Sequence, residues 1–380
     1  MIWVAGALLL LAVLTCLELG FGMRRIERLA DLPARDPEGA PHVTIVAAAR
    51  DEATMIEPAV RSMLGMRYPS FQIVVVNDRS TDATGAILDR LAAKDPRLLP
   101  VHVAELPPGW LGKNHALQVG ADCAAGEWIL FTDADIHMHP EALSRAMRYA
   151  EFYGVDHLAA TPSLEMPGVL LKGFSMLFLF IFASFAKPWR ARNPNSWFHV
   201  GVGAFNLVRR SAYEGVGGHS RIALRPDDDM KLAKILKRGG YRADLVDGSS
   251  VLRVEWYQSL PEMVRAFEKN MFAGLDYNVL LSVVGGLLQL ALTAIPLIGV
   301  LVTTGIPRLL LGAQVALSVA VFAYLAKRIR VSPLVALTYP LVSGLFVFIL
   351  WRTMVLNLSE GGLQWRGTFY PLKLLKANRV

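Results

Sequence analysis

The chain has 380 residues, of which 53% are hydrophobic, and its formal net charge is +7. Its mean hydropathy of +0.38 is too high for an ordinary soluble enzyme. The basic balance does not indicate nucleic-acid binding, because the sequence has no long basic run with interleaved aromatic residues. Cys16 and Cys123 are the two cysteines, so neither a structural disulfide nor a CxxC metal site is expected.

Residues 1–23 are expected to form a retained membrane anchor. This stretch is nearly uncharged apart from Glu18, and three arginines follow it between positions 24 and 28. A signal peptide would place its positive residues before the apolar core and a small-residue cleavage site after it, and this segment does neither. The positive-inside rule then places the polar region 24–278 in the cytoplasm and the N-terminus outside.

Residues 279–351 predict a cluster of C-terminal membrane spans, because they contain no acidic residue and few basic ones. The basic residues divide the stretch into three apolar blocks, at about 279–303, 309–326 and 331–351. Each block is near the ~20 residues that a helix needs to cross a bilayer. With the anchor, the simplest count is four spans.

Four complete spans conflict with the charge of the tail, residues 352–380. Four crossings return the C-terminus to the outside, whereas the basic residues of this tail are typical of a cytoplasmic segment. Pro340 in the last apolar block leaves a re-entrant or broken segment as an alternative, which would keep the tail inside. Both topologies stay open on the sequence alone.

Residues 169–187 form one more apolar stretch, with five phenylalanines. Trp189 and Arg190 follow it, as is typical of a segment end at the level of the lipid headgroups. A full span here would place the polar residues after it across the membrane from those before it. We therefore predict an in-plane interfacial helix, with a span as the alternative.

The polar region 24–278 predicts an α/β domain. Short runs rich in β-branched residues alternate with helical patterns, and this alternation is typical of an open, mainly parallel sheet with helices on both faces. In such sheets ligands bind at the carboxyl ends of the strands. The predicted strands are 42–49, 71–76, 98–103 and 128–131, and the predicted helices between them are 54–64, 82–93 and 114–124.

Acidic residues follow three of these four strands. Glu52 comes after the first strand, Asp78 and Asp82 after the second, and Asp133 and Asp135 after the fourth. Carboxylates at strand ends can hold a divalent cation and the diphosphate that it neutralises, whereas the alternative is a turn or a helix cap. We favour the cap for Asp82. For Asp78, directly at the strand end, we favour a hydrogen bond to a ribose or base.

The segment 107–117 offers a possible phosphate contact. Gly112 allows close approach of the backbone, and Lys113 at a predicted helix start supplies an ammonium group and free amides. The spacing is not that of a Walker motif, and a solvated lysine is the alternative. His115 has no partner at a metal-ligand spacing and is expected to pack or to form hydrogen bonds.

Taken in order, these motifs resemble those of family 2 glycosyltransferases with a GT-A fold, over most of residues 42–275. The resemblance implies a nucleotide-sugar donor, a divalent cation, Mg²⁺ or Mn²⁺, held chiefly by Asp135, and Lys113 near the donor. It also implies nucleotide-sugar contacts from Glu52, Asp78 and Asp133. The motifs are Ala-Arg-Asp-Glu at 49–52, Val-Asn-Asp-Arg-Ser-Thr-Asp at 76–82, Gly-Lys-Asn-His-Ala-Leu at 112–117 and Asp-Ala-Asp at 133–135.

The membrane-anchored layout resembles the branch of this family that glycosylates lipids, such as ceramide glucosyltransferases and the hopanoid- and carotenoid-linked bacterial enzymes. This resemblance implies an integral protein of the bacterial inner membrane with a cytoplasmic catalytic domain. A membrane lipid acceptor and the bilayer itself are then the expected partners. No oligomeric state is predicted.

Inverting sugar transfer needs a base that takes the proton from the attacking hydroxyl. Three acids, Asp227, Asp228 and Asp229, open a predicted helix that runs to Arg238. The run resembles the family's Glu-Asp-x-x-Leu motif, in which the Asp is the base, so Asp229 takes the base position and Asp228 the Glu position. The alternative is a favourable charge at a helix N-terminus, which we favour for Asp227.

Four more residues are candidates for the acceptor or the diphosphate side. Gly203 lies in a stretch that resembles the acceptor-pocket segment of this family, with a plain turn as the alternative. Trp256 could form a platform for a sugar or pack in the core. The Gln/Arg-x-x-Arg-Trp motif of polymer- and ceramide-type relatives is absent from 265–274, which disfavours processive synthesis and leaves Arg265 or Lys269 for the cationic contact.

We therefore predict inverting, metal-dependent transfer of one sugar from a UDP-linked donor to a hydroxyl of a membrane lipid. Transfer to a polyprenyl phosphate or a growing polysaccharide is the alternative within enzymes. A non-catalytic membrane scaffold or transporter with a nucleotide-binding domain is the alternative of another class. The tail motif Trp365-Arg366-Gly367 resembles an element at the ends of some lipid-linked relatives, and the sequence predicts no role for it.

Overall fold

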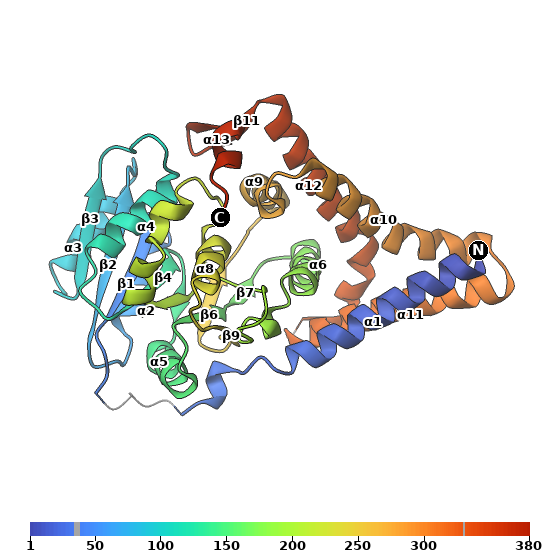
Figure 1. Cartoon of the computed structure of the whole chain (residues 1–380), viewed down its shortest axis with the longest axis horizontal. Helices are drawn as coiled ribbons and strands as arrows, with labels where there is room; N and C mark the ends of the chain where they lie inside the picture. Colours follow the sequence, from blue (N-terminus) through green and yellow to red (C-terminus); the bar gives the residue numbers. More distant parts are fainter. Residues whose placement is uncertain (34–38, 330) are drawn as a thin grey trace. The chain divides into compact units, whose positions relative to one another are not determined.

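The computed structural model describes residues 1–33, 39–329 and 331–380. The chain forms two compact units, each built from separate stretches of sequence (Figure 1). We call them the sheet unit, which comprises Arg25–Glu165, Pro188–Trp256 and Ala377–Val380, and the helical unit, which comprises Met1–Arg24, Met166–Lys187 and Tyr257–Lys376.

The sheet unit contains a seven-stranded sheet in the order β3-β2-β1-β4-β8-β6-β9. All neighbouring strands are parallel except β8, which is antiparallel to both β4 and β6. The predicted mainly parallel α/β sheet is confirmed. Its strands are β1 Val43–Ala49, β2 Phe71–Asp78, β3 Leu98–Val103, β4 Trp128–Asp133, β6 His157–Thr161, β8 Asn206–Arg209 and β9 Ala243–Asp247.

Helices cover both faces of this sheet, because its strand residues point alternately to opposite sides. Ile45, Ile73 and Leu130 face one core, with α2, α3 and α5, while Val46 and Ile129 face the other, with α4, α7 and α8. The helices are α2 Ile56–Leu64, α3 Thr84–Ala92, α4 Gly112–Asp122, α5 Ala142–Tyr153, α7 Arg210–Gly215 and α8 Asp228–Arg238.

A small second sheet follows directly on Asp135. Its strand order is β5-β10-β7, with β10 antiparallel to β5 and parallel to β7. The strands are β5 His137–Met138, β7 Ser163–Glu165 and β10 Leu252–Glu255, and the short 3-10 helices of the chain are η1 Leu29–Asp31, η2 Pro188–Arg190, η3 Gly218–Ile222, η4 Ala273–Leu275 and η5 Pro333–Thr338.

Five helices among the described residues are long and apolar enough to cross a membrane. They are α1 Ile2–Met23, α6 Val169–Ala186, α10 Val279–Val302, α11 Gly305–Arg328 and α12 Tyr339–Ser359, and the shorter helices of the helical unit are α9 Leu260–Asn270 and α13 Leu372–Ala377. Since α11 starts at Gly305, Arg308 lies inside the helix instead of separating two spans. The last helix starts at Tyr339 and not at position 331, and Pro340 sits in its first turn, where a missing N–H removes no helical bond.

A proline inside α10 leaves one backbone carbonyl oxygen without its helical hydrogen bond, and a side chain of α11 binds this oxygen. Pro296 has no N–H, so the carbonyl oxygen of Leu292, four residues earlier, loses its usual helical partner. Gln314 of α11 donates a hydrogen bond from Nε2 to this oxygen at 3.3 Å. A side chain from the neighbouring helix thus satisfies the carbonyl that the proline leaves open.

The Trp365-Arg366-Gly367 motif forms the turn of a hairpin, β11 Gly362–Trp365 and β12 Thr368–Pro371. Arg366 and Gly367 both have positive φ, at 45° and 78°, as two-residue turns between antiparallel strands require. The ammonium of Lys269 lies 5.3 Å from the centre of the Trp365 ring. The motif therefore has a local structural role within the helical unit.

Candidate active site

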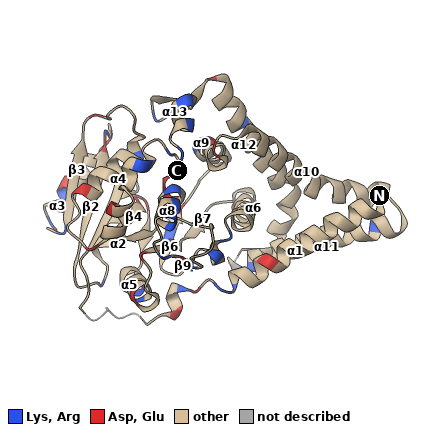
Figure 2. Cartoon of the chain, in the orientation of Figure 1, with Lys and Arg blue, Asp and Glu red and all other residues tan. Residues whose placement is uncertain are grey.

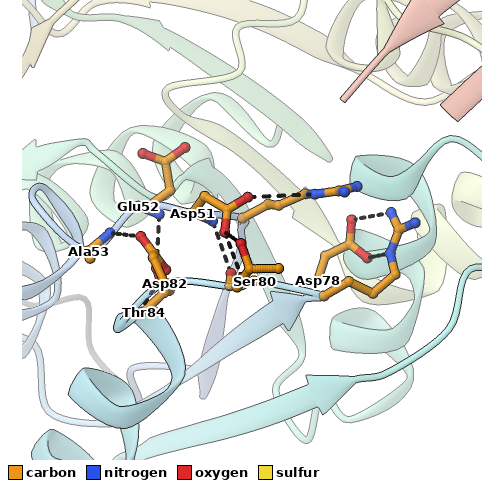
Figure 3. A network of polar contacts seen from close by, with 10 residues as sticks. Asp51, Glu52, Ala53, Asp78, Ser80, Asp82 and Thr84 are labelled. Carbon is orange, nitrogen blue, oxygen red and sulfur yellow. Dashed lines mark hydrogen bonds and ion pairs between the residues drawn. The ribbon is translucent and has the colours of Figure 1, made fainter. Parts of the chain in front are cut away.

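The loops after β1 and β2 are bound to each other by side-chain to backbone hydrogen bonds (Figure 3). Asp51, at a positive φ of 55°, accepts from the N–H of Thr81 at 2.7 Å, and its own N–H donates to Ser80 at 2.9 Å. Asp82 accepts from the N–H groups of Ala53 and Thr84, at 3.0 and 2.9 Å. Ala83 is the N-cap of α3 and makes no side-chain cap bond, so Asp82, one residue earlier, supports the first residue of the helix without being its cap, and the network fixes the loop that carries Glu52.

Glu52 is held through its backbone in this network. Its N–H donates to the hydroxyl of Thr84 at 2.9 Å, and Figure 3 shows its carboxylate pointing away from Asp82 and Thr84. The side chain is partly buried. A nucleotide contact from Glu52 stays a prediction.

Asp78 is the last residue of β2 and is 3% exposed. Arg79 binds it with two parallel contacts, Nε to Oδ1 at 2.7 Å and Nη2 to Oδ2 at 2.9 Å. A Cβ atom at Gly112 would lie 2.6 Å from Nη2 of Arg79 and would also overlap Oδ2 of Asp78. Gly112 is therefore required for the start of α4 to approach this pair, and Arg79 is a site residue that the sequence reasoning did not single out.

Lys113 joins two acidic motifs that are far apart in the sequence. Its Nζ lies 2.8 Å from Oδ1 of Asp133 and 3.4 Å from Oδ2 of Asp228. Burial disfavours the ammonium form, but Asp133 and Asp228 outweigh burial and raise the pKa of Lys113. The lysine is therefore a permanent cation between the β4 end and the start of α8.

Asn114, which is 1% exposed, fixes the distance between these two motifs. Its Nδ2 donates to the carbonyl oxygens of Ile222 at 2.8 Å, of Ala223 at 3.2 Å and of Arg225 at 2.9 Å. These carbonyls belong to the segment that leads into α8. Because Asn114 neighbours Lys113, one buried amide holds the α8 acids close to the lysine.

Asp133 and Asp135 end β4 in different surroundings. The N–H of Asp133 donates to the carbonyl of Gly203 at 3.0 Å, and the Asp133 side chain is 42% exposed. Burial, followed by the negative charges of Asp133 and Glu52, raises the pKa of Asp135 to about 7. Asp133, Glu52 and Asp135 thus bring three carboxylates close together, and a bound cation would offset their mutual repulsion.

The residues present match the donor set of Mg²⁺ or Mn²⁺ only in part. Among residues 1–33, 39–329 and 331–380, no group of three acidic, histidine or cysteine side chains is placed to hold a metal. Magnesium is usually bound by one or two carboxylates, with substrate phosphates and water as the other ligands. Asp135, with Asp133 beside it, fits that description.

Asp229 is partly buried at the start of α8, and both of its oxygens accept backbone hydrogen bonds. The N–H of Gly203 donates to Oδ2 at 2.9 Å, and that of Met230 donates to Oδ1 at 2.7 Å. Burial, followed by the charge of Asp228, raises the pKa of Asp229 to about 7. A carboxylate with these properties is oriented and can exchange a proton near neutral pH.

Gly203 lies between the two acidic motifs, where a side chain would crowd the Asp133 carboxylate. A Cβ atom at this position would lie 2.8 Å from Oδ2 of Asp133. The N–H of the same residue binds Asp229. The structure therefore brings Gly203, Asp133, Lys113, Asp228 and Asp229 together. Gly203 contacts carboxylates of the protein here, and its role toward an acceptor stays a prediction.

A cavity of about 10 Å³, enough for one water molecule, lies beneath these acids. Two buried residues that line it, Asn206 and His219, were not predicted. Nδ1 of His219 pairs with the hydroxyl of Tyr213 at 2.8 Å, and burial, with Lys113 nearby, lowers the pKa of His219 to about 3. A lone histidine and a lone asparagine carry no spacing pattern from which the sequence could have shown them.

The remaining candidates have no contact with these acids among those described above. Trp256 belongs to the sheet unit, where its N–H donates to the carbonyl of Glu165 at 3.0 Å. Arg265 and Lys269 belong to α9 of the helical unit, where Nε of Arg265 donates to the carbonyl of Pro261 at 3.3 Å. Their roles toward acceptor or diphosphate stay predictions.

Residues 44–217 match the model of glycosyl transferase family 2. With the GT-A type sheet and the acids at its strand ends, this match shows that the chain contains a family 2 glycosyltransferase domain. The matched range includes Asp78, Lys113, Asp133 and Asp135. It ends before α8, so Asp229 stands on the geometry described above.

Among curated proteins, the chain is similar to the "Probable glycosyltransferase YdaM" of Bacillus subtilis, with 27% identity over 50% of this chain and 46% of the relative. It is also similar to the 4,4'-diaponeurosporenoate glycosyltransferase of Staphylococcus haemolyticus, with 20% identity over 63% of this chain and 64% of the relative. The chain thus spans less than two thirds of each of these relatives.

Among solved structures, the fold resembles that of the mannosyltransferase PcManGT from Pyrobaculum calidifontis, which was solved in complex with GDP-Man and Mn²⁺. The TM-score is 0.57, the sequence identity is 20%, and the match covers 94% of this chain and 99% of that chain. At this identity the likeness shows the fold, which is the predicted GT-A type.

Proposed function

We propose that the protein transfers one sugar from a nucleotide-sugar donor, UDP-linked by preference, to a hydroxyl of a membrane lipid with inversion at the anomeric carbon. The observation that carries the proposal is the ion-pair bridge from Asp133 through Lys113 to Asp228. The bridge joins two acidic groups. The first is the end of β4, where a cation could bind the donor diphosphate, and the second is the acid pair of α8, where the acceptor hydroxyl could lose its proton. In this proposal the catalytic unit faces the cytoplasm of a bacterial inner membrane.

Asp229 acts as the base in this reaction. It takes the proton of the acceptor hydroxyl while the acceptor oxygen forms a bond to the anomeric carbon. The bond from that carbon to the diphosphate breaks, and the nucleoside diphosphate leaves with the electron pair. The hydrogen bonds from Gly203 and Met230 orient the Asp229 carboxylate, and Asp228 keeps Lys113 beside it.

The donor side consists of residues at the ends of β1, β2 and β4. Asp135 holds a divalent cation, Mg²⁺ or Mn²⁺, which supplies charge neutralisation for the leaving diphosphate when bound. Lys113 provides a second positive charge close to Asp133. Glu52, Asp78 and Asp133 take the nucleotide-sugar contacts. The GDP-Man and Mn²⁺ in the similar mannosyltransferase support this donor and metal class.

The acceptor proposal rests on the helices that could cross a membrane and on the carotenoid named for the similar staphylococcal enzyme, which supports the lipid class of the acceptor, whereas the hydroxyl group is part of the proposal. Arg265 and Lys269 on α9 could provide further cationic contacts, and Trp256 could provide an aromatic platform. A polyprenyl phosphate or a growing polysaccharide is the alternative acceptor. A non-catalytic scaffold is disfavoured, because a protein that only binds nucleotides does not need a carboxylate that is oriented and partly buried as that of Asp229 is.

The test is a transfer assay with purified full-length protein, radiolabelled UDP-sugars or GDP-sugars, Mn²⁺ or Mg²⁺, and lipid extract. Label that is extracted into organic solvent supports a lipid product, and loss of this label from the organic phase after mild acid treatment indicates a polyprenyl phosphate product. Label that stays in an aqueous polymer indicates a polysaccharide. Absence of metal-dependent nucleotide binding in a calorimetric titration would favour the scaffold.

A further inference from the structure

The chain leaves the sheet unit before α6 and returns to it directly afterwards. Strands β4 and β6 precede α6, β8 and β9 follow it, and all four belong to one sheet. One hydrogen-bonded sheet lies on one side of a bilayer, because its polar loops cannot be buried in hydrocarbon. Glu165 and Pro188 are therefore on the same side, and α6 begins and ends there.

The C-terminal residues also return to the sheet unit. Nδ2 of Asn378 donates to the carbonyl of Arg221 at 3.1 Å, and its Oδ1 accepts from the N–H of Leu224 at 2.9 Å. Val380 packs against the core on the α4 and α8 face of the sheet. The number of membrane crossings between Trp256 and Asn378 must therefore be even, so no more than two of α10, α11 and α12 can cross.

The pairing of α12 with α10 identifies α12 as the helix that does not cross. Nε1 of Trp351 donates to the carbonyl of Ser282 at 3.0 Å, and the hydroxyl of Thr293 contacts that of Tyr339 at 3.2 Å. These contacts show that α12 packs beside the first half of α10 and that the two helices run in opposite directions. Since α12 begins at Tyr339, it starts beside the middle of α10.

The far half of α10 packs against α11 instead. The nine residues that follow Thr293 in α10, up to Val302, add about 14 Å at 1.5 Å per residue. There Gly299 lies against Leu311 of α11, so closely that a Cβ atom would overlap the leucine side chain. α10 and α11 thus pack antiparallel on both sides of the turn that joins them, and Figure 2 shows α10 without a charged residue.

Contacts place α6 and the η5–α12 segment next to each other within the helical unit. Gly173 of α6 packs against Thr338 and Val342. A Cβ atom added at Gly173 would lie 3.3 Å from a side-chain carbon of Val342. Both segments carry strongly exposed apolar side chains. These are Phe185 of α6, 70% exposed, and Leu334, Leu337 and Leu341 of η5–α12, which are 71%, 68% and 61% exposed.

The ends of these two segments carry ion pairs that a lipid interface can accommodate. Lys187, directly after α6, pairs with Glu18 near the end of α1 at 2.7 Å. Arg352 in α12 pairs with Glu268 of α9 at 3.0 Å. A charge at the centre of a bilayer is costly, whereas long side chains at the headgroup level keep their charge hydrated. The pairs are consistent with positions close to one membrane surface.

We infer that the chain crosses the bilayer three times, with α1, α10 and α11, while α6 and η5–α12 insert from the side of the sheet unit and return to it. The exposed apolar residues of α6 and η5–α12 then contact the lipid chains of that one leaflet. This arrangement removes the conflict between four spans and a basic tail, because the tail stays on the side of the sheet unit. It depends on chain connectivity and packing and is independent of the proposed sugar transfer.

The inference is tested by cysteine accessibility in the full-length protein in sealed membranes. Native Cys123 is exposed on the sheet unit and serves as the reference, with Cys16→Ser to remove the cysteine of α1. In a Cys16→Ser, Cys123→Ser background, single cysteines replace four exposed residues: Asn195, Thr304 and Ser332 in connecting segments, and Ala377 at the end of α13. A membrane-impermeant maleimide is applied to intact spheroplasts and to inverted vesicles, and labelling in detergent gives the total reactive thiol.

We expect Asn195→Cys, Ser332→Cys and Ala377→Cys to be labelled from the same face as Cys123, and Thr304→Cys from the opposite face, with at least a tenfold difference between the two preparations. Asn195→Cys on the opposite face would show that α6 crosses and overturn the inference. Ala377→Cys on the opposite face would show an odd number of crossings. Ser332→Cys opposite with Thr304→Cys on the Cys123 face would show that α11 and α12 cross and α10 does not.

Discussion

Asp135 and Asp229 have raised pKa values for partly different reasons. Around Asp135, burial is followed by the negative charges of Asp133 and Glu52. Around Asp229, burial is followed by the charge of Asp228, and two backbone N–H groups hold the carboxylate, whereas Lys113 opposes the rise in pKa at both residues. In the proposed function Asp135 holds a cation, and Asp229, which the N–H groups of Gly203 and Met230 orient, acts as the base. The variants below test this proposed separation of roles.

The largest expected effect is on turnover by Asp229→Asn, which removes the base and keeps the size of the side chain. We expect kcat to fall by about 10³-fold, within the range of general-base contributions. Donor affinity, measured by calorimetry, should change by less than about twofold, because binding does not use the base. Asp122→Asn, an exposed change on α4, is the matched control and should leave both quantities unchanged. Near wild-type turnover of Asp229→Asn would remove Asp229 from the role of base.

The next effect is on metal dependence. Asp135→Asn should raise the Mn²⁺ concentration needed for half-maximal donor binding by about 10- to 100-fold, because a neutral amide replaces the anionic ligand. The measurement is a nucleotide titration at a series of Mn²⁺ concentrations. Asp229→Asn should leave this curve in place. Equal shifts in the two variants would contradict the separation of roles.

A smaller effect is expected from Gly203→Ala, which changes both regions together. The added Cβ atom would lie 2.8 Å from Oδ2 of Asp133, so either the Asp133 carboxylate or the Gly203 backbone that binds Asp229 must move. We expect kcat/KM to fall about 10-fold, since misplacement of reacting groups by less than 1 Å is costly. Gly65→Ala, where the nearest atom would be 3.4 Å away, is the control and should behave as wild type.

The smallest change is a pH profile. If Asp229 is the base, kcat/KM should rise with pH and level off above an apparent pKa near 7, because only the carboxylate accepts a proton. Asp229→Asn should lose this acid limb in its residual rate. For stability the sign is opposite. The folded pKa lies above the ordinary 3.8, so the native state binds the proton more tightly, and the contribution of Asp229 to the unfolding free energy should fall as pH rises from about 4 to 7.

The sequence predicted the features that depend on local patterns. The alternating strands and helices, the acids at strand ends and Lys113 at a helix start all follow from period, composition and position. The structure confirms the mainly parallel sheet and places Lys113 between Asp133 and Asp228. It also shows that Asp82 supports the first residue of α3.

Other features depend on long-range contacts that one sequence does not display. The three carbonyl partners of Asn114 lie more than a hundred positions later, and His219 and Asn206 come from segments beyond α6. Strand β8 lies antiparallel between β4 and β6. It comes after the apolar helix α6 in the sequence, so its place in the sheet could not be predicted from the strands that precede it. The start of α12 depends on the 3-10 turns of η5, which apolar composition does not reveal.

The most direct test of the central claim is a product assay that compares wild type and Asp229→Asn in the same membranes. Both proteins are incubated with radiolabelled UDP-sugar and Mn²⁺, and the lipids are extracted into organic solvent. The account predicts labelled glycolipid with wild type and about a thousandfold less with Asp229→Asn, at equal metal-dependent donor binding. Labelled lipid at similar levels from both proteins, or no labelled product from wild type with any nucleotide-sugar, would contradict it.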